Sequence, residues 1–170
     1  MTLGHPLPSS PRWSWLRYRW NRTSLLNFDL PFDLIAARCR FAQVYLATPY
    51  TLLAKDGAGE WSTHGSDAAA KHAALWARRL ALRSVASASP IIQSVAMINA
   101  DSLGHLDPLN EAFWSGYCQP ILAASWAVIV PPIDGWSRSL GVWREVCYAL
   151  ERNKPVFVIQ EEGRVSSYEG

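Results

Sequence analysis

Short apolar segments alternate with longer amphipathic segments along most of this chain. Residues 44–47, 85–88, 127–130 and 156–159 are runs of apolar residues, as expected for the strands of a buried sheet. Helical spacing is seen at 66–83, at 110–124 with an interruption expected near Pro120, and after Ser139. This alternation predicts a single doubly wound parallel α/β sheet, flavodoxin-like or Rossmann-like, with helices on both faces. Ligands are expected in a crevice at the carboxyl ends of its strands.

The beginning of the chain does not share this pattern. Residues 1–40 hold six arginines and two aspartates, a net charge of +4, whereas the remainder carries −2. Arginines are mixed with aromatic residues at 12–20, which suits stacking on nucleic acid, contact with a membrane surface, or packing on the domain or a second subunit. We favour packing, with nearby prolines predicting an extended arm. The chain is therefore divided into a basic, aromatic extension (1–42), a domain (43–160) and a tail (161–170).

Composition narrows the class of protein. With 170 residues and 49% apolar content, the chain can bury one core. A net charge of +2 gives no broad electrostatic footprint for nucleic acid, so nucleic acid is not an expected partner. The three cysteines form no CxxC pair and the four histidines show no metal spacing, so neither a metal nor a cofactor is expected. Without a membrane span or a signal peptide pattern, we expect a cytoplasmic protein.

One segment places several chemically useful residues at the start of a predicted helix. A turn at 131–135 follows the third predicted strand, and Ser139 is a good N-cap for a helix that begins at Leu140. Free amides in the first turn of that helix can bind a phosphate, and Gly141 lets the ligand come close. Glu145 falls at the flank of the buried stripe. The same spacing also fits an ordinary capped amphipathic helix with a solvated Glu145.

Four short motifs resemble one superfamily when they are taken in order. They read YLATPYT at 45–51, SPI at 89–91, FW at 113–114 and GWSRSLGV at 135–142. Together with Glu145 they look like the nucleoside 2-deoxyribosyltransferase and deoxynucleotide N-glycosidase superfamily. Within it they resemble an uncharacterised branch, a domain of unknown function, whose members read YLASPYS, SPI, FW and GWxxSxGV. Each motif alone is weak, and the resemblance covers roughly residues 43 to 160.

The resemblance implies a chemistry and a set of site residues. Glu145 is implied as the nucleophile that attacks the anomeric carbon of a ribose or deoxyribose, giving a covalent glycosyl-enzyme. Tyr45 matches a first-strand tyrosine placed near the base, and Ser139 matches a serine that binds the 5′-phosphate. The substrate is then a nucleotide or nucleoside. Further substrate-binding or phosphate-binding residues at the crevice are expected to be Thr48, Tyr50, Gly135 and Gly141.

Two departures from the superfamily pattern bear on activity. Cys118 stands where the superfamily carries an aspartate that contacts the sugar or assists the leaving base, and a thiol is a weak donor without charge at neutral pH. Residues 93–95 read Gln-Ser-Val where the branch has Ser-His. Four carboxylates remain as possible substitutes, although each also fits a solvated loop position. They are Asp101, Asp107, Glu111 and Asp134.

Two classes of function therefore remain open. The first is an N-glycosidase or 2-deoxyribosyltransferase with Glu145 as nucleophile. The second is a catalytically impaired nucleotide-binding or interaction module of the same fold. In either case we expect at least a homodimer, because superfamily members complete their sites across subunits and nine tryptophans exceed what one small core readily buries. Residues 52–65, which hold three glycines, are expected to form a mobile loop that can act as a lid.

Overall fold

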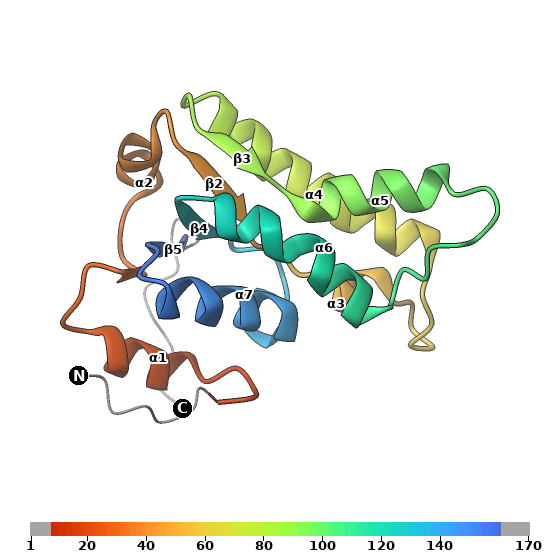
Figure 1. Ribbon diagram of the computed structural model, residues 1–170, viewed down its shortest axis with the longest axis horizontal. Helices are drawn as coiled ribbons and strands as arrows, with labels where there is room; N and C mark the ends of the chain where they lie inside the picture. The colour runs from red at the N-terminus through yellow and green to blue at the C-terminus, as the bar shows by residue number, and fades with distance from the viewer. Residues whose placement is uncertain (1–7, 161–170) are drawn as a thin grey trace.

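A computed structural model describes residues 8–160 and shows one five-stranded sheet in which every strand is parallel to its neighbours (Figure 1). The order of the strands across the sheet is β1-β5-β4-β2-β3. The strands are β1 (Leu26–Asn27), β2 (Gln43–Leu46), β3 (Ala86–Ala88), β4 (Ala127–Val130) and β5 (Val156–Val158). The expected α/β class with a parallel sheet is confirmed, and the four predicted strands are present with small changes in their bounds.

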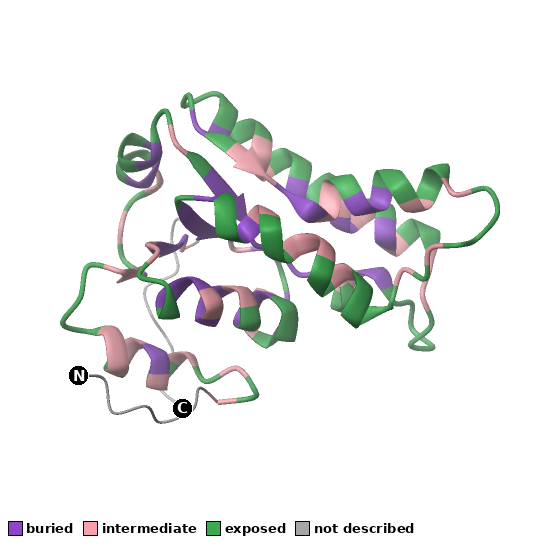
Figure 2. Cartoon of the chain, viewed as in Figure 1, coloured by how far each residue is buried: buried purple, intermediate pink, exposed green. Residues whose placement is uncertain are grey.

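Alternation along the central strands sends side chains to two separate cores. In β4, Val128 and Val130 belong to one buried cluster, whereas Ala127 and Ile129 belong to the other. A pleated strand turns successive side chains to opposite faces, so a strand that is apolar throughout must be covered on both sides. Figure 2 shows the central strands largely buried between the surrounding helices, whereas the edge strand β3 is only partly buried. The sheet is thus the middle layer of the fold.

Helices cover both faces of this sheet. One face is covered by α1 (Trp13–Trp20), α6 (Glu111–Ala124) and α7 (Leu140–Glu151), and the other by α2 (Phe32–Cys39) and α4 (Thr63–Ala81). The remaining helices are α3 (Thr51–Ala54) and α5 (Pro90–Ala100), which contact α4, and the short 3-10 helix η1 (Trp136–Arg138) before α7. Neither α2 nor α5 was expected from the sequence.

The strand order locates the edge at which ligands bind in such folds. From β2 the chain first goes to β3 on one side, and then returns to β4 on the other side. This reversal makes the carboxyl ends of β2 and β4 the switch point, where a crevice opens in open parallel sheets. The loop at 47–50 and the turn at 131–135 both leave the sheet there. The expected placement of these two segments at one edge agrees with the structure.

The prediction that residues 52–65 form a loop is wrong at both ends. Residues 51–54 form α3, and α4 begins at Thr63 because the Ser62 hydroxyl accepts a hydrogen bond from the Gly65 amide, 3.1 Å away. A Cβ at Gly65 would lie 2.5 Å from the Leu53 carbonyl oxygen. Gly65 therefore serves close packing between α3 and α4. Within residues 52–65, only the turn around Gly59, whose φ is +84°, requires glycine for its backbone conformation.

The expected interruption at Pro120 is also absent. Helix α6 continues through Pro120 to Ala124. Proline removes one backbone hydrogen bond, but the next two residues, Ile121 and Leu122, pack against the core cluster and hold the following turn in place. Tertiary packing thus outweighs the local preference at this position.

The aromatic segment at 12–20 forms a helix, so the extended-arm prediction is wrong there. Trp13 of α1 donates a hydrogen bond to the Ser137 carbonyl oxygen at 2.7 Å and packs edge-on against Trp136 and Trp143. The extension also supplies β1, which pairs with β5 at the edge of the sheet. The tryptophans therefore pack on the domain, as favoured. Pro6 and the tail at 161–170 lie outside the described residues.

Candidate functional site

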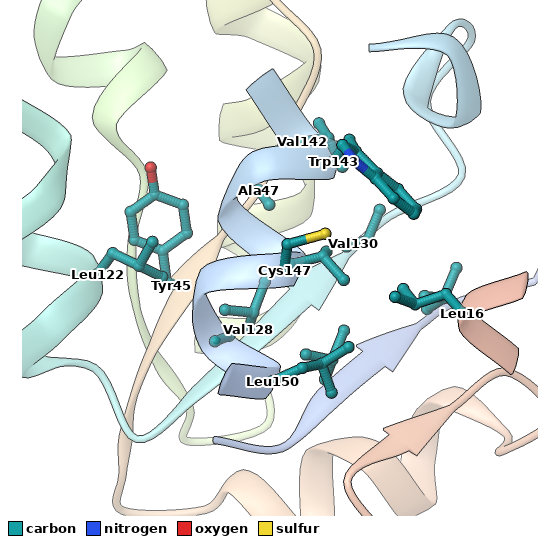
Figure 3. Packing of buried hydrophobic residues seen from close by; sticks show 14 of the residues in the cluster. Leu16, Tyr45, Ala47, Leu122, Val128, Val130, Val142, Trp143, Cys147 and Leu150 are labelled. Atoms are coloured by element: carbon teal, nitrogen blue, oxygen red, sulfur yellow. The ribbon is translucent and has the colours of Figure 1, made fainter. Parts of the chain in front are cut away.

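Tyr45 and Glu145 meet between α6 and α7, although they lie 100 positions apart in the sequence. Tyr45 is the third residue of β2 and is 1% exposed, and its hydroxyl donates a hydrogen bond to Glu145 Oε1. Figure 3 shows the Tyr45 ring between these helices, with its oxygen directed toward the end of α7 that carries Val142. This is the end of the helix that lies near the carboxyl edge of the sheet.

Burial changes the protonation of this pair. Desolvation raises the pKa of Glu145 from 4.5 to about 8, and the hydrogen bond from Tyr45 opposes that rise only in part. The pKa of Tyr45 is raised well above 10, first by burial and then by the nearby Glu145 charge. At neutral pH the Glu145 carboxyl group therefore carries its proton most of the time, unlike a solvated glutamate. A strongly shifted carboxyl group near the ligand edge of an α/β sheet is a candidate for acid, base or nucleophilic chemistry.

Cys118 lies beside the same pair. It is half-buried on α6 and packs against the core cluster that contains Tyr45. Burial and the Glu145 charge raise the pKa of its thiol to about 11, and an interaction with the Tyr45 hydroxyl lowers it only slightly. The thiol is consequently neutral at physiological pH. The three residues expected to carry the chemistry are thus brought together, and Cys118 contributes no charge.

The start of α7 is built as expected from the sequence. Ser139 is buried, and its hydroxyl accepts a hydrogen bond from the Val142 amide at 3.3 Å, which makes it the N-cap of α7. Gly141 is exposed, and a Cβ there would meet only the Ser139 hydroxyl, 3.8 Å away. Gly135 has a φ of +82°, and an added Cβ would lie 3.2 Å from Leu52 of α3. The approach to the first turn of α7 is therefore open, whereas Gly135 serves the tight turn.

The two residues expected after β2 have different surroundings. Thr48 is buried, and its hydroxyl finds no hydrogen-bond partner among the described residues. The Tyr50 hydroxyl lies 3.0 Å from the Ser66 hydroxyl and accepts a hydrogen bond from the Trp61 ring nitrogen at 2.9 Å. Tyr50 thus fastens the turn at 55–61 to α4, while Thr48 retains an unused polar group.

Ser89 is a residue that the sequence analysis did not select. It follows β3 directly, is 4% exposed, and its hydroxyl also lacks a partner in the described part of the chain. The only signal in the sequence was its place within the SPI motif at the end of a predicted strand. Its likeness to Thr48 is apparent only from burial and hydrogen bonding.

The residues considered as substitutes for the missing aspartate are engaged elsewhere. Asp101 accepts a hydrogen bond from the Leu106 amide at 2.6 Å, and this bond lowers its pKa. Asp107 accepts from the Leu109 amide, and Glu111 pairs with Arg144 across α6 and α7. Asp134 is exposed in the turn before η1. Within residues 8–160, no group of three or more potential metal ligands is found.

Two surface pockets, of about 250 and 190 Å³, lie away from the expected crevice. The first lies between residues 8–9 and α7, and the second between α2 and α4. Neither is lined by Glu145. The Tyr45–Glu145 pair lies between α6 and α7, where Glu145 remains only half-buried.

Comparison with known proteins identifies the family but no characterised relative. A family model described as a domain of unknown function, DUF1937, matches residues 42–161, so the chain belongs to this family. Neither the curated proteins nor the solved structures contain a match to this chain. Among the described helices, none is both long and apolar enough to cross a bilayer.

Proposed function

We propose that this DUF1937 member cleaves or transfers the N-glycosidic bond of a nucleotide or nucleoside, with Glu145 as the nucleophile. The observation that carries this proposal is the half-buried Glu145 carboxyl group, which has a raised pKa and accepts a hydrogen bond from Tyr45 beside the ligand edge of the sheet. The resemblance to the nucleoside 2-deoxyribosyltransferase and deoxynucleotide N-glycosidase superfamily assigns the nucleophilic role to this same glutamate. No metal or cofactor is needed for this chemistry.

The reaction begins from a protonated Glu145. The carboxylate must attack the anomeric carbon, the bond from that carbon to the base nitrogen must break, and the base must gain a proton. Because its pKa is raised to about 8, Glu145 is protonated when the substrate binds. This proton can pass to the leaving base as Glu145 ionises. Tyr45 holds the carboxylate in place. Water or a second base then attacks the anomeric carbon of the glycosyl-enzyme, the bond from that carbon to the Glu145 oxygen breaks, and the proton of the attacking group returns to Glu145.

The first turn of α7 is the proposed phosphate site. The amides of Leu140 and Gly141 precede the first intrahelical bonds, and the open surface at Gly141 allows an anion to approach them. Arg138 lies immediately before this turn, is exposed, and forms no ion pair with an acidic residue within 8–160. A 5′-phosphate bound there places the sugar next to Glu145 on the following turn. A nucleotide is therefore favoured over a nucleoside.

A catalytically impaired nucleotide-binding or interaction module is the second candidate. It is favoured by Cys118, whose neutral thiol stands where the superfamily carries a charged aspartate. Such a module would bind a nucleotide at the first turn of α7 without breaking it. The two candidates share a site and differ only in turnover.

The protein is further proposed to act as a homodimer or a larger homo-oligomer. Helix α6 buries only Leu122, although it carries several large apolar residues, among which Phe113 is 49% exposed. A helix of this composition is expected to be covered, and a second copy can also close the open side of the site. Light scattering should give at least twice the chain mass at roughly tens of micromolar protein, a concentration at which an assembly of micromolar affinity is populated. A monomer at this concentration contradicts this part of the proposal.

We also propose a cytoplasmic location, because the free thiols Cys39, Cys118 and Cys147 fit a reducing compartment.

Release of free base from a panel of ribonucleotides and deoxyribonucleotides, measured by chromatography, tests the function. Wild-type protein should release base from at least one of them, and the rate should fall above about pH 8, where Glu145 has already lost the proton that the base must gain. Glu145→Gln should lower the rate at least ~100-fold and still bind the nucleotide. Glu151→Gln, at an exposed position of the same helix, is the control and should retain the wild-type rate. Nucleotide binding without base release by wild-type protein would establish the binding module instead.

A further inference from the structure

Two buried hydroxyl groups at the ligand edge of the sheet lack hydrogen-bond partners. Thr48 is 6% exposed and lies two residues beyond β2, whereas Ser89 is 4% exposed and follows β3 directly. Among buried side-chain polar atoms in the described residues, only these two are unsatisfied. Such groups are rare in folded proteins, because water or a protein partner normally satisfies them. Because both lie at the ends of adjacent strands, one ligand could satisfy both hydroxyls.

The register of the sheet places the two hydroxyls near one another. Tyr45 is paired with Ala88, so the next residue on each strand, Leu46 and Ser89, are neighbours in turn. Because side chains alternate, Ser89 faces the side of the sheet opposite to Tyr45. Thr48 lies two residues beyond Leu46, just past the end of β2. Both residues thus lie at the carboxyl edge of the sheet, and Ser89 faces away from the side that carries Glu145.

The side chain of Ser89 does not cap the helix that follows it. It is the N-cap of α5, yet its side chain makes no capping hydrogen bond, and Pro90 occupies the first helical position. A serine at an N-cap normally accepts a bond from one of the first amides. The hydroxyl and the free amides of the first turn of α5 therefore remain available to a ligand.

These groups can bind a neutral, planar polar ligand. Hydroxyls both donate and accept hydrogen bonds, and backbone amides donate to a carbonyl oxygen or a ring nitrogen. An uncharged donor and acceptor set of this kind fits the edge of a nucleobase. The phosphate is expected at the first turn of α7 and the sugar at Glu145. A nucleotide lying across the strand ends then brings its base to Thr48 and Ser89.

We propose that Thr48 and Ser89 form the subsite that recognises the base of the nucleotide. This inference rests on the proposed function, since it takes the same substrate. The hydroxyls have no contact with solvent, so the base enters by displacing the cover of the site. Helix α3 begins three residues after Thr48, has only four residues, and rests its half-exposed Leu52 on Gly135.

Calorimetric titration tests this subsite without requiring turnover. The probes are a nucleoside monophosphate and the matching sugar 5-phosphate, which lacks a base, each added to wild-type protein, Thr48→Val and Ser89→Ala. Each variant should bind the nucleotide about 10-fold more weakly, as expected for one lost hydrogen bond, and the sugar phosphate with unchanged affinity. Ser94→Ala is the control, because its buried hydroxyl already donates to the Ile91 carbonyl oxygen and lies outside the subsite. It should leave both affinities unchanged.

Stability of the free variants separates recognition from a structural role. If the hydroxyls have no partner in the ligand-free protein, Thr48→Val removes an unsatisfied group, and the free protein should melt at the same or a higher temperature. A lower melting temperature for both variants means that a buried water satisfies them, and the proposal fails. It also fails if the nucleotide and the sugar phosphate weaken equally, if neither weakens, or if wild-type protein binds no nucleotide. Base-dependent binding without cleavage would overturn the proposed function alone.

Discussion

Helices α6 and α7 cover the same face of the sheet and share the candidate site, but they are held very differently. Helix α7 buries six residues, including Trp143 and Val146, whereas α6 buries only Leu122 (Figure 2). Glu145 therefore projects from a helix fixed by the core, and Cys118 from one that is fixed mainly at its last turns. The comparison indicates that α7 forms a rigid wall of the site within a single chain. Helix α6 is weakly anchored there, so it either moves or is supported by a second copy.

The largest expected difference between the two helices is in stability. Trp143 is 1% exposed and lies between Trp13 and the core, so Trp143→Ala should lower the free energy of unfolding by about 3–5 kcal/mol. Phe113→Ala on α6 removes a half-exposed ring and should cost less than about 1 kcal/mol. Urea denaturation at low protein concentration measures both. Equal losses would show that α6 is anchored within the single chain as firmly as α7.

The same pair of variants also reports on assembly. Stability that depends on a second copy increases with protein concentration. Wild-type protein should then gain stability on concentration, and Phe113→Ala should gain less, while Trp143→Ala keeps the wild-type dependence. A wild-type midpoint that does not change with concentration argues against any role of α6 in assembly.

Glu145 should lower stability at high pH, which gives the next largest effect. The unfolded chain releases the Glu145 proton near pH 4.5, but the folded chain keeps it until about pH 8, so the folded state loses stability as the pH rises between these values. Glu145→Gln should therefore stabilise the protein by about 1–3 kcal/mol at pH 8 and by almost nothing near pH 4. Thermal or urea denaturation across this range measures the difference. A variant that is less stable than wild-type protein at pH 8 would show that the buried carboxyl group is well satisfied.

The sequence predicted those features that depend on local periodicity. The four strands from β2 to β5 and helix α7 follow from runs of apolar residues and from the Ser139 cap, whose signals lie within a few residues. Strand β1 has only two residues and exists because β5 offers an edge, so no local pattern marks it. Gly65 shows the same limit, because its glycine serves a contact with Leu53 that only the folded chain creates.

The residues selected from the sequence as a candidate site lie together in the fold, but their physical state could not be predicted from the sequence. The resemblance selected Tyr45, Cys118 and Glu145, and the fold brings them together across 100 positions. The raised pKa of Glu145 depends on burial between two helices, which no spacing along the chain reveals. Ser89 was missed for a related reason, since an unpaired hydroxyl is defined only by its surroundings.

The smallest expected effect concerns Cys118 on α6, the helix that the core supports less. Cys118→Asp restores the carboxylate of the superfamily pattern, so base release should stay the same or rise by up to about 10-fold. A new charge in this half-buried place also opposes ionisation of Glu145, which moves the pH dependence of the reaction upward. Chromatographic rates from pH 6 to 9 measure both changes. Cys118→Ser, which is neutral, is the control. A large loss with aspartate but not with serine would show that the site has adapted to a neutral group.

The central claim is that Glu145 forms a covalent bond with the sugar. Mass spectrometry of protein mixed with a nucleotide that it cleaves, quenched in acid and digested, tests this directly. We expect the peptide that contains Glu145 to gain the mass of the sugar phosphate as an ester, and the corresponding peptide of Glu145→Gln to remain unmodified. An adduct on a different residue, or wild-type turnover by Glu145→Gln, would contradict the account.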